Sequence, residues 1–274
     1  MNPRPVILFR TYEYEQEAAI AARYLPVLEN LAQIKPNDLV IGRFSLQPFY
    51  DLVAAEIEGK GAQLLVSYAD YYFISHLLQW SGLLAGLTPR SWDVEQIAEI
   101  PELPHGYFIK GETNSLKHEW QSSYTADQDA ILALVNNLRA QPLLAAQTMV
   151  VREFVPLQTY FLTAAGLPIT EEYRFFILDG QVISGGFYWQ SYLPAIRAAG
   201  FEPDFHCVPS DFLAEVARRL EFLRFFVVDV AITAAGEPLV IEINDPGMSG
   251  LGGNDAERLY AALAQRLGGV KTNR

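Results

Sequence analysis

Three polar side chains interrupt two strongly apolar runs near the end of the chain: Asp229, Glu242 and Asn244. The runs, FFVVDVAI and PLVIEIN, are short and rich in Val, Ile and Phe, which predicts two strands of a β-hairpin that turns near Ala235-Gly236. Because side chains alternate along a strand, Glu242 and Asn244 should share one face of the hairpin. The other face should carry Leu239, Ile241 and Ile243.

A turn centred on Ala235-Gly236 would place Asp229 directly opposite Glu242. Two carboxylates at that spacing repel each other, so a compensating charge is expected. Mg²⁺ is the simplest candidate, since it takes a few carboxylate or amide oxygens and leaves room for phosphates. Asp245 should point to the opposite face and is not expected to be a ligand. The alternative interpretation is an antiparallel pair whose polar face lies in water.

A second group of charged residues lies inside other segments that are predicted to be strands. Lys110 ends HGYFIKGE, Arg152 and Glu153 interrupt TMVVREFVPL, and Arg174 lies in EEYRFFIL. Polar side chains in such segments need a reason to be there. The alternatives to a functional role are structural. Lys110 would be a lysine whose stem snorkels at a strand end, Arg152 and Glu153 an exposed pair, and Arg174 a partner of Glu172 or Glu153 in a salt bridge.

Composition limits the classes of function. The chain has 274 residues, half of them apolar, and a formal net charge of −12, which argues against nucleic-acid binding. Its single cysteine, Cys207, excludes an internal disulfide and a cysteine-based zinc site. No apolar run approaches the ~20 residues needed to span a bilayer, and the N-terminal run is too short for a signal peptide. We therefore expect a cytoplasmic protein without a membrane partner.

The order of elements predicts two regions of different character. Residues 1–87 alternate strand and helix signals in a βαβ pattern, with an amphipathic helical stretch over 13–32 that Pro26 should kink or split. Residues 88–105 carry three prolines and are expected to be a connector. Residues 106–274 are expected to be α+β, with antiparallel hairpins, one of them turning at Asp179-Gly180.

These residues together resemble the ATP-grasp superfamily, the fold of ATP-dependent carboxylate–amine ligases. The resemblance covers about residues 105–268, and its most specific part is the D-x12-E-x-N pattern of the last hairpin. The α/β first region is similar to the domain that usually precedes ATP-grasp, here followed by an α+β ATP-grasp domain with antiparallel sheets. Two arginines and a lysine also resemble the clade that is named for those residues.

The resemblance implies roles for the charged residues. Lys110 would contact the phosphates of ATP, and Lys117, in the polar loop 111–124, would cover them. Residues Glu153, Phe154 and Val155 would form a hinge beside the adenine, with Arg152 next to it. Arg174 would make a bidentate contact to a phosphate or acyl phosphate. The metal ligands would be Asp229, Glu242 and Asn244, and the glycine-rich segment 246–253 would offer backbone N–H groups to an anion.

The predicted function is an ATP- and Mg²⁺-dependent ligase that joins a carboxylate to an amine through an acyl phosphate. Lys110 and Arg174 would be its catalytic residues. The substrates are expected to be small molecules or peptides, and homo-oligomerisation is left open. One alternative is an ATP-grasp kinase that phosphorylates a hydroxyl. The other is a nucleotide-binding or interaction module without turnover.

Overall fold

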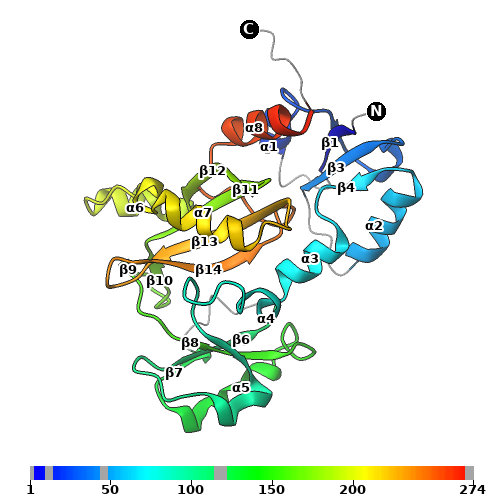
Figure 1. Cartoon of the computed structure of the whole chain (residues 1–274). Helices are drawn as coiled ribbons and strands as arrows, with labels where there is room; N and C mark the ends of the chain where they lie inside the picture. Colours follow the sequence, from blue (N-terminus) through cyan, green and yellow to red (C-terminus); the bar gives the residue numbers. More distant parts are fainter. Residues whose placement is uncertain (1–2, 10–14, 44–48, 114–121, 269–274) are drawn as a thin grey trace.

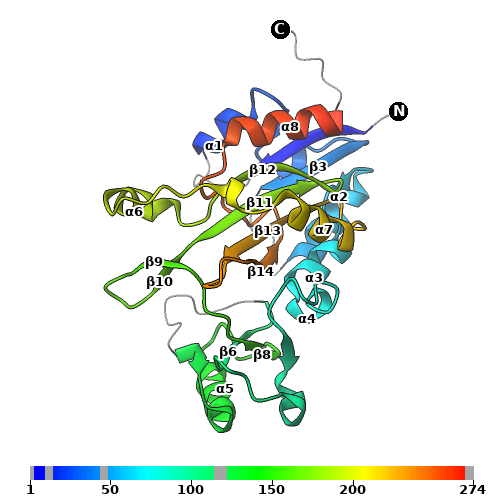
Figure 2. The ribbon, with the colours of Figure 1, turned by 60° about the vertical axis from the view of Figure 1, so that its left-hand side comes forward.

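A computed structural model describes residues 3–9, 15–43, 49–113 and 122–268. The described residues form three four-stranded sheets and a two-stranded ribbon. Figures 1 and 2 show the helices on the outer faces of these sheets. Within those ranges, no helix combines the length and the apolarity needed to cross a membrane.

The first sheet is parallel, in the order β2-β1-β3-β4, and confirms the predicted βαβ arrangement. Its strands are β1 (Arg4–Phe9), β2 (Val27–Leu28), β3 (Asp38–Arg43) and β4 (Gln63–Leu64). The helices of this region are α1 (Glu15–Ala21), η2 (Leu31–Gln33), α2 (Tyr50–Gly59), α3 (Tyr68–Ser75) and α4 (Leu77–Trp80). The helical stretch predicted over 13–32 does not continue past Pro26: α1 ends before it, and the helix predicted after Pro26 is wrong, because the chain continues there as β2 and η2.

The second sheet is antiparallel, in the order β5-β8-β6-β7, and is the lowest part of Figure 1. Its strands are β5 (Ser91–Asp93), β6 (Tyr107–Gly111), β7 (Tyr124–Thr125) and β8 (Met149–Glu153). The helical segments beside it are η3 (Val94–Glu99), η5 (Gln128–Ala130) and α5 (Ile131–Arg139). The expected connector 88–105 is therefore structured, since it supplies β5 and η3.

The third sheet is antiparallel, in the order β12-β11-β13-β14. Its strands are β11 (Glu172–Leu178), β12 (Gln181–Phe187), β13 (Phe225–Ile232) and β14 (Pro238–Asn244). Asp179 and Gly180 form the predicted turn with φ of 46° and 73°, which suits a two-residue hairpin loop. The ribbon of β9 (Thr159–Leu162) and β10 (Pro168–Thr170) extends from one side (Figure 2). The helical segments are η6 (Gln190–Tyr192), α6 (Leu193–Ala198), η7 (Phe205–Cys207), α7 (Ser210–Arg219) and α8 (Ala256–Gly268).

Two apolar cores hold these layers together. One core runs without a break from the first sheet to the third. Helix α8 joins the two sheets, because it packs against α1 and β1 on one side and against β12 of the third sheet. The other core lies between the second sheet and α5. Strand β13 is buried along its whole length in the first core, so a charged residue on it must find its partner inside the protein.

Candidate functional site

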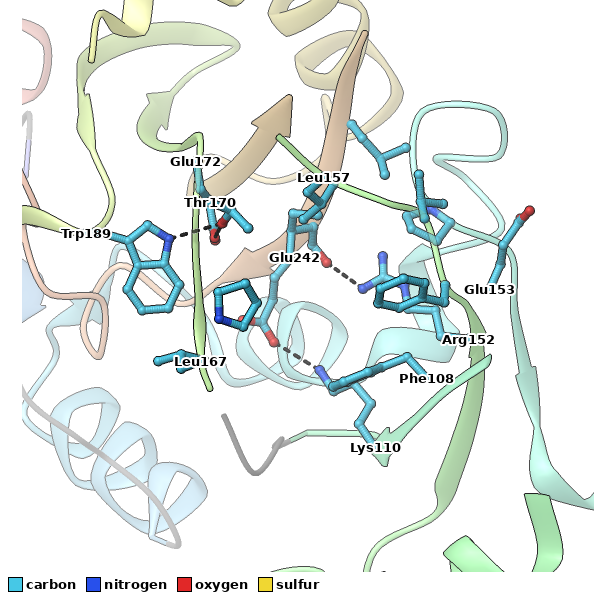
Figure 3. A pocket seen from close by; sticks show the side chains of 16 residues that line it. Phe108, Lys110, Arg152, Glu153, Leu157, Leu167, Thr170, Glu172, Trp189 and Glu242 are labelled. Atoms are coloured by element: carbon cyan, nitrogen blue, oxygen red, sulfur yellow. Dashed lines mark hydrogen bonds and ion pairs between the residues drawn. The ribbon is translucent and has the colours of Figure 1, made fainter. Parts of the chain in front are cut away.

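A cavity of about 220 Å³ lies where the second sheet, the β9–β10 ribbon and β14 meet (Figure 3). Most of its wall is apolar, with Phe108 from β6, Ile241 from β14 and Leu167 beside β10. Its charged lining residues come from four strands, β6 and β8 of the second sheet and two strands of the third sheet, β11 and β14: Lys110, Arg152, Glu153, Glu172 and Glu242. An apolar slot with charges gathered at part of its wall suits a ligand with a flat ring and an anionic tail.

Lys110 on the second sheet and Glu242 on the third sheet meet directly at the wall of the cavity. Lys110 Nζ donates to Glu242 Oε1 at 3.1 Å, and the Lys110 side chain is buried. The predicted phosphate-binding lysine and the predicted metal ligand therefore lie at one place, although 132 residues separate them in the chain.

Arg152 lies beside this pair and is the most unusual charge in the site. Its Nη1 donates to Ile241 O at 2.6 Å and its Nη2 to Thr88 Oγ1 at 2.6 Å. In the described part of the chain its buried Nε has no hydrogen-bond partner, and no carboxylate forms an ion pair with it. Burial lowers the pKa of Arg152 to about 10, with partial compensation from the charge of Glu242. The guanidinium is therefore a fixed positive charge at neutral pH, which an anion in the cavity would stabilise.

Arg174, Asp229 and Glu242 form one row across β11, β13 and β14. Arg174 is the register partner of Asp229, and Asp229 is the register partner of Glu242, as the hairpin pattern predicts. Asp229 receives hydrogen bonds from Arg174 Nε at 2.8 Å, Arg174 Nη2 at 2.7 Å and Asn244 Nδ2 at 2.9 Å. Burial alone would lower the pKa of Arg174, but the charge and hydrogen bonds of Asp229 raise it instead.

The salt bridge of Arg174 is thus made to Asp229, and neither Glu172 nor Glu153 forms it. Glu153 pairs with Arg90, whose Nε donates to its Oε2 at 2.9 Å. Arg174 lies outside the cavity lining, and the ring of Tyr188 covers its Cζ at 4.8 Å. This position favours an arginine that holds Asp229 in place over one that reaches directly into the cavity.

The predicted alternation of β14 fails at Ile241. The register shifts between Asp229 and Val230, so that Val230 pairs with Val240 and Ile241 is left as an extra residue. Such a bulge turns neighbouring side chains to one side. Ile241 and Leu239 therefore line the cavity together with Glu242, while Val240 and Ile243 are buried.

The hinge residues Glu153 to Val155 line the cavity as one backbone segment. The N–H of Glu153 donates to Arg90 O at 2.9 Å, and the N–H of Phe154 donates to Gly106 O at 3.0 Å. Among the described residues, no acceptor receives the N–H of Val155. This donor is the one that remains to bind the edge of a ring in the cavity.

Sequence reasoning gave no site role to a polar chain on the opposite wall. Trp189 Nε1 donates to Thr170 Oγ1 at 3.2 Å, and Thr170 Oγ1 donates to Glu172 Oε2 at 3.2 Å. All three residues line the cavity (Figure 3). The only sequence signal is that Glu172 precedes Arg174 by two residues and so shares its face of β11.

The predicted site residues thus fall into two adjoining groups. Lys110, Arg152, the hinge 153–155 and Glu242 line the cavity, while Arg174, Asp229 and Asn244 lie next to it, joined through the Asp229–Glu242 register pair. Lys117 lies outside the described residues. Within those residues, no group of three or more His, Cys, Asp or Glu side chains is placed to hold a metal, so a cation would depend on two carboxylates and an amide.

Comparison with solved structures finds the same fold in ATP-grasp proteins. A RimK domain ATP-grasp protein from Sphaerobacter thermophilus has a TM-score of 0.62 at 16% identity, with 96% of this chain and 99% of that chain covered. A RiPP-associated ATP-grasp ligase from Chryseobacterium gregarium, in complex with ADP and a leader and core peptide, has a TM-score of 0.58 at 13% identity, with coverages of 97% and 96%. A D-cycloserine synthetase has a TM-score of 0.58 at 13% identity, with coverages of 96% and 99%. At these identities the likeness shows the fold.

The comparison with curated proteins finds no match to this chain. A family model matches residues 99–263, more than half of the chain, and describes the ATP-grasp domain of family 3 in the clade named for two arginines and a lysine. The match contains Lys110, Arg152, Arg174 and the whole β13–β14 hairpin. The chain therefore belongs to the ATP-grasp superfamily, in family 3 of that clade.

Proposed function

We propose that the protein is an ATP- and Mg²⁺-dependent ligase that activates a carboxylate as an acyl phosphate and transfers the acyl group to an amine. The observation that carries this proposal is the cavity itself. It combines apolar walls with the Lys110–Glu242 pair and the buried cation of Arg152, which forms no ion pair with a carboxylate among the described residues. ATP has the matching form, with a flat base at one end and a polyanion at the other.

In this proposal the adenine lies between the apolar walls, beside the hinge. The Val155 N–H and the hinge carbonyls would bind the edge of the base. Because Glu153 is paired with Arg90 at 2.9 Å, we assign the base contact to the backbone of the hinge. The triphosphate then extends toward Lys110 and Arg152, where its charge would replace the missing anionic partner of Arg152. Lys117 keeps its proposed role over the phosphates.

The donor set of the hairpin fits a magnesium ion by its chemistry. Asp229 and Glu242 are cross-strand partners, and Asn244 donates from Nδ2 to Asp229, so two carboxylates and one amide group lie close together. Their oxygens are the hard donors that Mg²⁺ prefers. Asp229, Glu242 and Asn244 would hold the ion, with Arg174 keeping the carboxylate of Asp229 in position. When bound, Mg²⁺ would supply charge neutralisation to the phosphates.

The segment 246–253 is the proposed place for the carboxylate substrate. In the described part of the chain, no acceptor receives the N–H groups of Gly250, Leu251 and Gly252. Gly252 has a φ of 57°, and Gly250 faces open space where a side chain would be. Successive N–H groups in such a conformation bind anions.

The chemistry then proceeds in two balanced steps. A carboxylate oxygen of the acceptor attacks the γ-phosphorus of ATP, the bond to the bridging oxygen breaks, and ADP leaves. The amine nitrogen next attacks the acyl carbon, phosphate leaves, and the leaving phosphate takes the proton that the nitrogen loses. Lys110 and Arg152 would offset the phosphate charge throughout, and the apolar walls would exclude water from the acyl phosphate.

The solved structures of similar fold support including peptides among the substrates to be tested. By their descriptions, two ligases of this fold were solved with precursor or core peptides. The net charge of −12 makes a strongly anionic acceptor polymer a poor choice. Small acids and peptide carboxylates are therefore the first panel.

The first experiment is a thermal melt with Mg²⁺ alone, ATP alone, ADP with Mg²⁺, and ATP with Mg²⁺. We expect a shift that needs both nucleotide and Mg²⁺, worth about 2.7 kcal/mol at a hundredfold excess over Kd. ADP release with paired acids and amines follows. Product that forms without an amine and is a stable phosphate ester would identify a kinase, and binding without any ADP release would indicate a module without turnover.

Glu242→Gln tests the assignment of the site, because it removes the charge and keeps the shape. It should abolish the Mg²⁺-dependent shift and turnover. Glu237→Gln is the matched control, since Glu237 is exposed and precedes the same strand. Unchanged turnover in Glu242→Gln would overturn the metal assignment.

A further inference from the structure

A buried polar cluster joins the first sheet to residues 246–253, which follow the β13–β14 hairpin. Arg43, the last residue of β3, donates from Nε and Nη2 to Glu17 Oε1 at 2.9 and 2.7 Å. The hydroxyl of Tyr260 on α8 donates to the same oxygen. All three side chains are less than 10% exposed, so this is a satisfied ionic cluster inside the core.

The remaining nitrogen of Arg43, Nη1, contacts residues outside the first sheet. Its Nη1 donates to Ser249 O at 2.8 Å and also to Pro246 O, which lie more than 200 residues further along the chain. Residues 246–253 begin two positions after Asn244. A second buried arginine, Arg174, donates from Nη1 to Gly250 O at 2.9 Å.

The two arginines thus donate to three carbonyls of one short segment, those of Pro246, Ser249 and Gly250. Arg174 also donates to both carboxylate oxygens of Asp229, so its contact to Gly250 fixes the position of the segment relative to the third sheet. Arg43 sets it relative to the first sheet, and its Cζ lies 5.9 Å from the ring of Phe176 on β11. With these carbonyls turned toward the guanidinium groups, the N–H groups of residues 250–252 are left for another partner.

We propose that Arg43 is a positioning residue for the carboxylate substrate, acting through residues 246–253. The inference rests on the proposed function, in which this segment binds the acceptor. The first sheet would then contribute to binding the carboxylate substrate but not to binding the nucleotide. Arg43 contacts residues 246–253 and does not line the nucleotide cavity. Arginine is needed because its planar fork serves Glu17 and two carbonyls at once, which a lysine ammonium cannot match.

The test uses the full chain and two variants. Arg43→Lys keeps the charge and loses the fork. Glu17→Gln with Arg43→Met removes both charges, so that no unpaired ion stays buried if a single variant is unstable. The control is Arg4→Met, which removes an arginine of the same sheet whose Nε binds Asp38 at 2.7 Å, away from the segment.

Hydrogen–deuterium exchange reports on the segment without any substrate. The amides of Met248, Ser249 and Gly253 are hydrogen-bonded and should be protected in the parent protein. We expect their exchange to accelerate at least about tenfold in both Arg43 variants, while amides of α2 stay unchanged, because the anchoring charge-assisted bonds are lost. Unchanged exchange at these amides, or equal acceleration in Arg4→Met, would overturn the proposal.

Kinetics separates positioning from general damage. With the carboxylate found by the ADP-release screen, the KM for that carboxylate should rise at least about tenfold in the double variant, with a smaller rise in Arg43→Lys. The affinity for ADP with Mg²⁺ should stay that of the parent. Equal losses in nucleotide and carboxylate affinity would overturn the proposal. If the parent protein itself binds no nucleotide, the proposed function fails, and the exchange experiment alone decides whether Arg43 anchors the segment.

Discussion

Arg174 and Asp229 lie directly opposite each other on β11 and β13, and the guanidinium donates to both carboxylate oxygens at 2.8 and 2.7 Å. Both side chains are buried, so the pair compensates two charges that the core could not otherwise accept. The same carboxylate belongs to the row that continues to Glu242. In the proposed function, Arg174 would therefore orient Asp229 toward the cation, even though it lies outside the cavity lining.

Replacing Arg174 with Lys should raise the Mg²⁺ concentration that nucleotide binding requires. A lysine keeps the charge but cannot bind both oxygens of Asp229, so the carboxylate becomes free to rotate. Loss of a residue that orients a metal ligand costs about 10–100-fold in metal affinity. The measurement is a Mg²⁺ titration of the ADP-induced thermal shift. An unchanged Mg²⁺ midpoint would show that Arg174 does not act through Asp229.

The β13–β14 hairpin could be predicted because neighbouring residues determine it. Two strand-length runs and a glycine near their midpoint place Asp229 opposite Glu242, and the structure has this register. Gly236 has a φ of 87°, a conformation that glycine adopts at little cost. The Asp179-Gly180 turn was predictable for the same reason. In both hairpins a few neighbouring residues determine the pairing.

Features that depend on distant partners could not be predicted in this way. The bulge that brings Ile241 into the cavity arises from the pairing with β13, and strand alternation alone places Ile241 on the wrong face. Arg43 looks like an ordinary strand-end charge, because Glu17 is 26 residues before it and Ser249 is 206 residues after it. Arg152 was predicted in the nucleotide site, but its lack of a carboxylate partner is visible only in three dimensions.

Replacing Arg152 with Met should separate binding from stability. Within the described residues Arg152 forms no ion pair with a carboxylate, but its guanidinium donates to Ile241 O and Thr88 Oγ1, so its removal should lower the free energy of unfolding by only about 1–3 kcal/mol. The affinity for ADP with Mg²⁺ should fall at least about tenfold, because charged hydrogen bonds to phosphate are lost. Chemical denaturation and calorimetric titration measure the two quantities.

Arg90→Met is the control for this separation. Arg90 is exposed and pairs with Glu153, an arrangement that contributes about 0–1 kcal/mol. It should leave both stability and ADP affinity almost unchanged. A large loss of stability in Arg152→Met with intact ADP affinity would make Arg152 a structural residue.

Asp38 should account for part of the loss of stability in acid. Burial alone would raise the pKa of its carboxyl, but the hydrogen bonds from Arg4 and from the N–H of Lys35 lower it. A carboxyl whose pKa is lower in the folded state stabilises the protein above its ordinary pKa, and this contribution disappears as the pH falls through the folded-state pKa. Asp38→Asn should therefore flatten the decline of unfolding free energy below about pH 4.

Replacing Gly186 with Ala should displace the segment that is proposed to bind the acceptor. A Cβ at Gly186 would lie 2.3 Å from the carbonyl carbon of Gly253 and 2.4 Å from the nitrogen of Asn254, and backbone atoms cannot rotate away. The protein should lose about 1–3 kcal/mol of stability, as overpacked sites do. Its exchange at the Gly253 amide, which donates to Phe187 O at 2.7 Å, should also accelerate.

Gly59→Ala is the matched control, since a Cβ there meets nothing within 4 Å and should add about 0.5–1 kcal/mol of stability at the end of α2. Equal stability of the two variants would show that the segment tolerates a shift and is not held closely against β12.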